Sequence, residues 1–234
     1  MERNRPRVSR RQLMQSASLG AGALMLGAAT RGHLGSDEAR AYQATPAAGT
    51  PGGSLIATVG CNDIRGFQTW QDSTACEYAT WSTIFDTLVE YDSEYNLAGG
   101  LFESWESEDA KTWTFNLRQG VQWHDGQPFV AADVISYFDT VLDPESGAAS
   151  NVLDSIADAT YEAVDDHTVQ LVLPQANAAI LDDFTSQWLA RTADFDNAQP
   201  VGTGPFSFVE WERNRQIKLA KNASYWKEGL PYLD

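Results

Sequence analysis

Residues 200–206, Pro-Val-Gly-Thr-Gly-Pro-Phe, and the hairpin that follows them decide the fold. Pro200 and Pro205 bracket two glycines, a spacing that excludes a helix and predicts a tight crossing loop whose backbone approaches another segment closely. Alternating apolar residues after the loop predict a β-hairpin with one apolar face: Phe206, Phe208, Trp211, Ile217 and Leu219. Because an isolated hairpin is marginally stable in water, this aromatic face must pack on another part of the chain.

The middle of the sequence alternates between helical and strand-like patterns. Apolar spacing near 3.6 residues predicts helices over 77–89, 130–142 and 176–189. Alternation predicts strands over 54–59 and 112–117 and a hairpin over 161–173 that turns at Asp165 and Asp166. Hairpins with helices packed on them favour a mixed α/β or α+β fold over a pure barrel.

The charge of the chain restricts its partners. Sixteen Lys and Arg stand against 32 Asp and Glu, a formal net charge of −16. Nucleic acid and anionic lipid both select basic surfaces, so we exclude nucleic acid as a partner and do not expect docking on anionic membranes. A strongly acidic surface is typical of a soluble protein, and attraction of a cationic ligand is the alternative explanation.

The first 41 residues have the pattern of an export signal. A basic head that contains Arg10 and Arg11 precedes an uncharged run over 16–30, which is too short to span a bilayer, and a small-residue site follows at Ala39 and Ala41. Ser-Arg-Arg-Gln-Leu-Met-Gln at 9–15 is typical of a twin-arginine signal; the alternative is a chance Arg pair in a general secretory signal. We predict a signal peptide over 1–41 and a flexible Pro, Ala, Gly and Thr linker over 42–53.

Two ordered blocks carry a family resemblance. The first is Leu-Phe-Glu-Ser-Trp through His-Asp-Gly to the helix start, residues 101–134; the second joins residues 200–206 to Asn-Ala-Ser-Tyr-Trp at 222–226 and Gly-Leu-Pro-Tyr-Leu-Asp at 229–234. Together they resemble the extracytoplasmic solute-binding proteins of ABC importers, family 5, which includes oligopeptide, dipeptide and nickel binders. The resemblance covers 54–234. It implies a type II periplasmic-binding-protein-like fold with two lobes, of which this chain supplies most of the N-terminal lobe.

The same resemblance implies a function and its partners. A chain of this kind is not an enzyme and needs no cofactor or metal; it is an exported monomer that captures a small solute in the cleft between its lobes. It then delivers the solute to the ABC permease subunits in the membrane. Peptide, sugar and metal chelate are all bound by relatives, and we expect peptide as the ligand class.

The predicted export of the chain decides how Cys61 and Cys76 are interpreted. Outside the cytoplasm two cysteines usually pair, and closing a loop of this length adds roughly 3 kcal/mol in the chain-entropy model. We expect a disulfide; two buried free thiols are the alternative, and a structural zinc site would need more ligands. In the family this first loop reaches the ligand cleft. Here Ile64, Arg65 and Gly66 replace the Leu-Asp-Pro-like turn that is usual in the family.

The loop between the cysteines supplies most of the candidate ligand contacts. Phe67 and Trp70 are aromatic residues in a polar segment, suited to stacking on a solute, and Asn62, Asp63 and Gln68 are suited to holding its polar groups. The alternative is a loop tied down by its own aromatic residues. Thr203, in the crossing loop, is a further candidate neighbour of the ligand.

His124 and Asp125 suggest an acid-base pair, but adjacent residues on a tight turn rarely face one substrate, and no nucleophile motif accompanies them. We therefore assign this His-Asp-Gly turn to the scaffold and predict no catalytic residue. Two rival functions are carried forward. One is a secreted carbohydrate-active or carbohydrate-binding protein, suggested by the tryptophans and carboxylates, and the other is a truncated remnant that does not transport.

Overall fold

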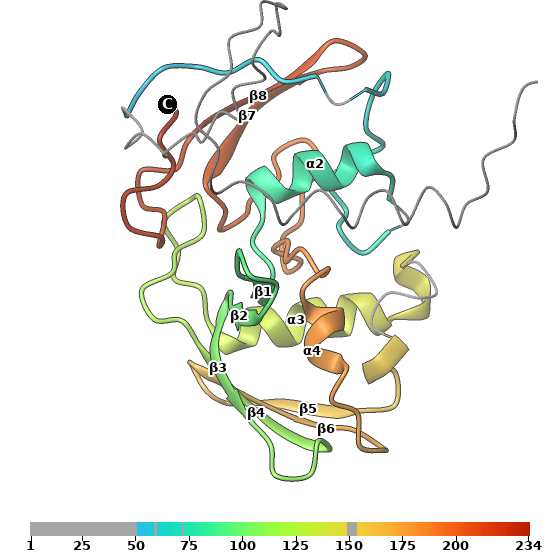
Figure 1. Cartoon of the computed structure of the whole chain (residues 1–234). Helices are drawn as coiled ribbons and strands as arrows, with labels where there is room; N and C mark the ends of the chain where they lie inside the picture. The colour runs from blue at the N-terminus through green and yellow to red at the C-terminus, as the bar shows by residue number, and fades with distance from the viewer. Residues whose placement is uncertain (1–50, 59, 72, 149–153) are drawn as a thin grey trace, which may run out of the picture. The chain divides into compact units, whose positions relative to one another are not determined.

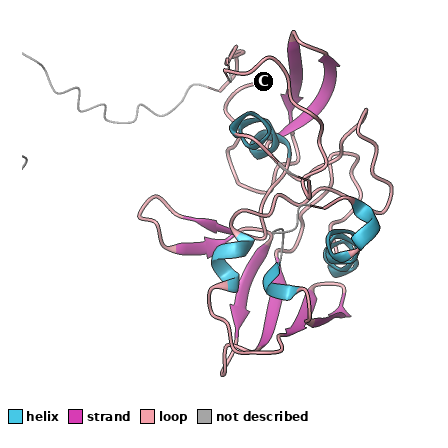
Figure 2. Ribbon diagram, turned by 90° about the vertical axis from the view of Figure 1, so that its right-hand side faces the viewer, coloured by secondary structure: helices cyan, strands magenta, loops and turns pink. Residues whose placement is uncertain are grey.

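The computed structural model of the chain describes residues 51–58, 60–71, 73–148 and 154–234 (Figure 1). Arg10, Arg11, the predicted signal peptide and most of the predicted linker lie outside the described residues. Within them, the fold is mixed α/β, and its strands form three separate antiparallel groups. Figure 2 shows the largest sheet and the C-terminal hairpin as distinct strand groups joined by loops.

The largest group is a four-stranded sheet in the order β3-β4-β6-β5. Its strands are β3 (Phe102–Glu106), β4 (Thr112–Leu117), β6 (Thr168–Val172) and β5 (Thr160–Asp165). β4 confirms the strand predicted over 112–117, and β5 with β6 confirms the predicted hairpin. Alternation explains the two faces of the sheet: Phe115 pairs with Val169, and both are buried, whereas Thr114 and Gln170 lie on the opposite face.

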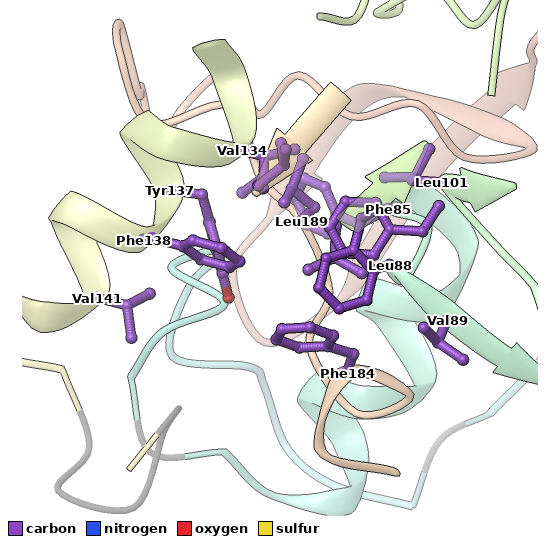
Figure 3. Close-up of a cluster of buried hydrophobic side chains, with 14 of the residues drawn as sticks. Phe85, Leu88, Val89, Leu101, Val134, Tyr137, Phe138, Val141, Phe184 and Leu189 are labelled. Carbon is purple, nitrogen blue, oxygen red and sulfur yellow. The ribbon is translucent and has the colours of Figure 1, made fainter. Parts of the chain in front are cut away.

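Helix α3 (Ala131–Leu142) covers the apolar face of this sheet and contacts β5 and β6. Its buried residues recur at the helical period, as predicted: Val134, Tyr137, Phe138 and Val141. Phe138 stacks on Phe184 of α4 (Ile180–Phe184), and Figure 3 shows these rings among the aliphatic side chains of the core. Asp143 caps the C-terminal end of the helix, and Pro144 opens the short 3₁₀ helix η1 (Pro144–Ser146). A second 3₁₀ helix, η2, covers Asp154–Ile156.

Helix α2 (Ala75–Ile84) is shorter than the helix predicted over 77–89. The helix ends because the carbonyl of Ile84 accepts a hydrogen bond from the Gly204 N–H (2.9 Å) instead of one from the next turn. Phe85 is already extended, and the chain continues into β1 (Val89–Tyr91), which pairs with β2 (Leu97–Gly99). Tertiary contacts have overridden the helical pattern.

Two other predictions are corrected. Residues 54–58 form no strand, and Val59 lies outside the described residues. The helix predicted over 176–189 reduces to α4, since Trp188 forms an isolated antiparallel bridge with Thr87 and Leu189 N donates to Asp86 O (2.9 Å). Backbone groups that bond to a distant segment cannot continue a helix.

The C-terminal hairpin consists of β7 (Phe206–Glu212) and β8 (Gln216–Lys221). The register shifts between Phe208 and Glu210, so Val209 is an extra residue, a β-bulge. The bulge explains why Phe208 and Trp211, three positions apart, both contact the ring of Phe67. The predicted aromatic face therefore exists, and an earlier part of the chain covers it.

Candidate functional site

The loop between the cysteines is fastened at both of its ends. Cys61 and Cys76 are joined by a disulfide in the structure, with Cα atoms 6.4 Å apart. At the start of α2, Thr74 and Glu77 form a capping box, in which the Glu77 carboxylate accepts the Thr74 N–H at 2.9 Å. The same carboxylate accepts the Arg65 N–H at 2.9 Å, so it ties the loop to the helix.

Glu77 is a buried acid, only 2% exposed. Burial alone would raise the pKa of its carboxyl, but hydrogen bonds from the Thr74 hydroxyl and from the Arg65 and Thr74 N–H groups lower the pKa to about 2. The side chain is therefore a carboxylate at any ordinary pH. It functions here as a loop anchor.

Phe67 and Trp70, the predicted stacking residues, point into the protein. Phe67 is 0% exposed and lies edge-on to Phe208 and Trp211, while Trp70 is 6% exposed and lies edge-on to Phe195. Their rings therefore contact the chain itself, which is the arrangement of a loop held down by its own aromatic residues. Burial in the core leaves neither ring a free face for a solute.

Asp63 connects the loop to the C-terminal hairpin. Its carboxylate accepts hydrogen bonds from Trp211 Nε1 (2.8 Å) and from the Asn214 N–H (3.0 Å). Burial opposes ionisation of the carboxyl, yet these bonds keep its pKa below the ordinary value. Asn62, its neighbour, is exposed. Of the five predicted loop contacts, Asn62 is exposed, Asp63 and Gln68 are half-buried, and Phe67 and Trp70 are buried.

A pocket of about 240 Å³ opens beside this loop. Trp81 forms one wall, and its Nε1 donates to the Gly66 carbonyl (3.0 Å), which holds the loop against α2. The complete lining is polar for the most part: Arg65, Gly66, Gln68, Gln71, Glu77, Trp81 and Gly147. Gln68 and Gln71 each offer a carbonyl and an amide group, the complement of a peptide bond.

The sequence contains a signal that identifies these two glutamines. Phe67 and Trp70 are apolar positions that the core takes up, so the polar residues directly after them, Gln68 and Gln71, are the ones left to face outward. The prediction from the sequence includes Gln68 beside the aromatic residues of the loop but does not include Gln71. The groups at the loop surface that could contact a solute are instead the amides of the two glutamines and the guanidinium of Arg65.

The crossing loop predicted at 200–206 presses its backbone against the end of α2. A Cβ on Gly204 would lie 2.6 Å from the Ile84 carbonyl, and one on Gly202 would meet the same carbonyl oxygen even more closely. Any side chain at these two positions would collide with backbone, which explains why glycine occupies both. Thr203, between them, is 0% exposed, so the predicted ligand neighbour is buried.

The buried carboxylate of Asp86 accepts hydrogen bonds from both the crossing loop and the C-terminal segment. Oδ2 accepts from Thr203 Oγ1 and from Trp226 Nε1, and Oδ1 accepts from the Tyr225 hydroxyl, each at 2.9 Å. Burial raises the pKa of the Asp86 carboxyl above its ordinary value, while the three donors oppose that rise. Beside this cluster Lys227 Nζ pairs with Glu90 at 2.6 Å.

His124 and Asp125 have structural partners. Asp125 forms an ion pair with Arg191 (2.6 Å), and Gly126 has a left-handed φ of 86° that suits the turn. His124 bonds only to the crossing loop among the contacts described: its Nδ1 accepts the Gly202 N–H (3.3 Å) and its Nε2 lies 3.0 Å from the Gly204 carbonyl. The two side chains thus serve different segments, as the scaffold interpretation of the His-Asp-Gly turn requires.

The described residues contain neither a metal-binding cluster of side chains nor a membrane-spanning helix. No group of three or more His, Cys, Asp or Glu side chains in residues 51–58, 60–71, 73–148 and 154–234 is arranged to hold a metal ion. In the same residues no helix combines the length and the apolar character that a membrane span requires.

Comparisons with known proteins agree with this architecture. The family model for bacterial extracellular solute-binding proteins, family 5 Middle, matches residues 96–234, more than half of the chain. A glutathione-binding protein GsiB of Pectobacterium atrosepticum is 33% identical over 161 residues, 65% of this chain and 31% of the relative. Di/tripeptide-binding protein 1 of Pseudomonas aeruginosa is 31% identical over 194 residues, 69% of this chain and 36% of the relative.

A solved structure extends the comparison to three dimensions. The periplasmic binding protein AgaA of A. tumefaciens R10, in complex with agropinic acid, superposes with a TM-score of 0.68 and 33% identity, covering 74% of this chain and 37% of AgaA. The fold is therefore that of a type II periplasmic binding protein over the matched part. The chain belongs to the family 5 bacterial extracellular solute-binding proteins. It spans about a third of the length of the curated relatives it matches.

Proposed function

We propose that this chain takes part in solute capture for an ABC importer, with a short peptide or peptide-like solute as ligand. Family membership supports the binding role. Two matched relatives are named for peptide ligands, one for glutathione and one for di- and tripeptides. The solute would enter an interlobe cleft, shift the protein toward a closed form, and pass to the membrane permease.

The observation that carries this proposal is the polar pocket beside the fastened loop. Its volume of about 240 Å³ is below the roughly 300–1,000 Å³ of complete ligand sites, so it suits one end of a solute, with the opposite wall contributed by a second lobe. Gln68 and Gln71 would exchange hydrogen bonds with peptide groups, and exposed Asn62 would lie at the edge of the site. Phe67 and Trp70 would support the loop from beneath, and buried Thr203 would hold the crossing loop through Asp86.

Native mass spectrometry of the protein purified from its own host tests the proposal. We expect a co-purifying peptide-sized mass and thermal stabilisation by di- or tripeptides. Replacing Gln68 and Gln71 by Ala should weaken that stabilisation, while replacing exposed Gln122, which lies outside the pocket, should not. Stabilisation by sugars alone would favour the carbohydrate-binding alternative. Absence of a response to peptides, sugars and metal chelates would favour a protein without a transport role.

Export is a separate part of the proposal. Residues 1–41 would act as a twin-arginine signal and place an acidic, monomeric binding protein outside the cytoplasm, with the chain from residue 54 onward forming the binding domain. The family's extracellular character supports this location. Replacing Arg10 and Arg11 by Lys should block export through the twin-arginine route, and unchanged export would contradict the assignment.

A further inference from the structure

The ring of His124 holds both ends of the Gly202–Gly204 segment. Nδ1 accepts the Gly202 N–H at 3.3 Å, so that nitrogen carries no proton, and the proton must then be on Nε2, which donates to the Gly204 carbonyl at 3.0 Å. The backbone N–H of His124 adds a third bond, to the Gly202 carbonyl at 2.9 Å. His124, which lies in the turn ahead of α3, thus fixes the loop that leads into β7.

This arrangement tolerates only the neutral imidazole. In the protonated ring both nitrogens are donors, so Nδ1–H would face the Gly202 N–H, and a hydrogen bond would become a contact between two donors. The loop has little freedom to relax in place, because the Gly202 and Gly204 backbones lie against the Ile84 carbonyl. Either the fold therefore resists protonation of the His124 ring, or protonation of the ring displaces the loop.

We propose that His124 is an acid-sensitive latch, which holds the crossing loop 202–204 when neutral and releases it when protonated. The inference goes beyond solute binding and does not depend on which solute is bound. An extracellular protein of this family meets the pH of its surroundings, where such a latch would loosen the junction between the sheet-bearing part of the chain and the β7–β8 hairpin.

The charged groups around the ring decide the pH range. Burial lowers the pKa of His124 below its ordinary value of 6.5, while the carboxylates of Asp86 and Asp125 act in the opposite direction. Arg191 forms an ion pair with Asp125 at 2.6 Å and another with Asp194 at 2.7 Å, so it offsets only part of the charge of Asp125. Because the folded-state pKa is lowered, the latch is fully closed above 6.5 and opens as the pH falls below that value.

Amide hydrogen exchange at Gly202 measures the latch directly. After correction for the intrinsic pH dependence of exchange, opening of the loop should increase by up to about tenfold per pH unit between the ordinary and the lowered histidine pKa. Exchange in β4 of the central sheet should not change over the same range. In the neutral state, NMR of the ring should show an unprotonated Nδ1 and a protonated Nε2.

Two variants separate the latch from general acid effects. H124Q keeps a side-chain donor near the Gly204 carbonyl but cannot titrate, so its Gly202 exchange profile should be flat. H167Q removes the histidine in the β5–β6 turn and should keep the wild-type profile. The proposal is overturned by a wild-type profile in H124Q, by Gly202 protection that persists while the ring titrates, or by global unfolding before Gly202 exchange increases.

Discussion

Replacement of Asp86 tests whether one buried carboxylate holds the crossing loop and the C-terminal segment together. Asp86 is 8% exposed and accepts three hydrogen bonds, from Thr203, Tyr225 and Trp226. In D86A all three donors lose their acceptor. Thr203 is fully buried and cannot reach water, whereas Tyr225 and Trp226 are half-buried and recover part of their hydration.

The expected loss of unfolding free energy follows from how exposed these three donors are. An unsatisfied buried donor costs about 1–3 kcal/mol, and the two half-buried donors cost less than that, so we expect D86A to lose about 2–4 kcal/mol of unfolding free energy. D86N should lose less than about 1 kcal/mol. In D86N the amide oxygen can accept the two hydrogen bonds that Oδ2 accepts in the original protein. The Tyr225 hydroxyl can rotate so that it accepts a hydrogen bond from the new amide nitrogen instead of donating one.

Urea unfolding followed by tryptophan fluorescence gives the free energies, and exposed Asp158 replaced by Ala is the matched control, expected within about 0.5 kcal/mol of the original protein. Equal losses in D86A and D86N would show that the negative charge, rather than the three hydrogen bonds, holds the segments. A loss below about 1 kcal/mol in D86A would show that the cluster does not join them.

The remaining predictions concern the two loops. G202A should lose about 1–3 kcal/mol, because its Cβ meets the Ile84 backbone, while G66A, whose Cβ has its nearest contacts with the Gln68 and Asn197 side chains rather than with backbone, should lose less; equal losses would contradict the packing argument. The pKa of Glu77 falls from 4.5 to about 2 on folding, so about 3 kcal/mol of stability should be present above pH 4.5 and disappear as the pH falls toward 2. Unfolding measured across that range should show a shallower slope for E77Q and an unchanged slope for exposed E162Q; a slope that persists in E77Q would assign it elsewhere. Replacing Cys61 and Cys76 by Ser should cost roughly 3 kcal/mol. Alkylation of two free thiols in the native protein would contradict the disulfide.

Elements with a complete local signal could be predicted from the sequence. Helix α3 carries five buried residues at helical spacing and a terminating Asp-Pro, and all of this information is local. The glycines of the crossing loop likewise predicted a close backbone approach, and Gly204 does lie against Ile84. The end of α2 could not be predicted in the same way, because the residue that takes the Ile84 carbonyl is far along the chain.

The candidate site was harder to predict because the same residue type suits opposite roles. An aromatic residue in a polar loop can face a ligand or anchor the loop, and only the position of the β7–β8 hairpin over Phe67 distinguishes the two. Asp86 was missed altogether. Its signal was present, since a lone acid in the apolar run 84–89 must find polar partners when it is buried, but the partners lie in the C-terminal segment.

The bulge at Val209 has a consequence for which substitutions β7 can accept. Before the bulge the residues that face Phe67 have even numbers, as Phe208 does, and after it they have odd numbers, as Trp211 does. A saturation mutagenesis scan of this strand should therefore show tolerance alternating with a period of two and changing phase at Val209. Deleting Val209 would restore a regular ladder in which Trp211 stands two positions after Phe208 and still pairs with Ile217, so the two rings would keep a common face.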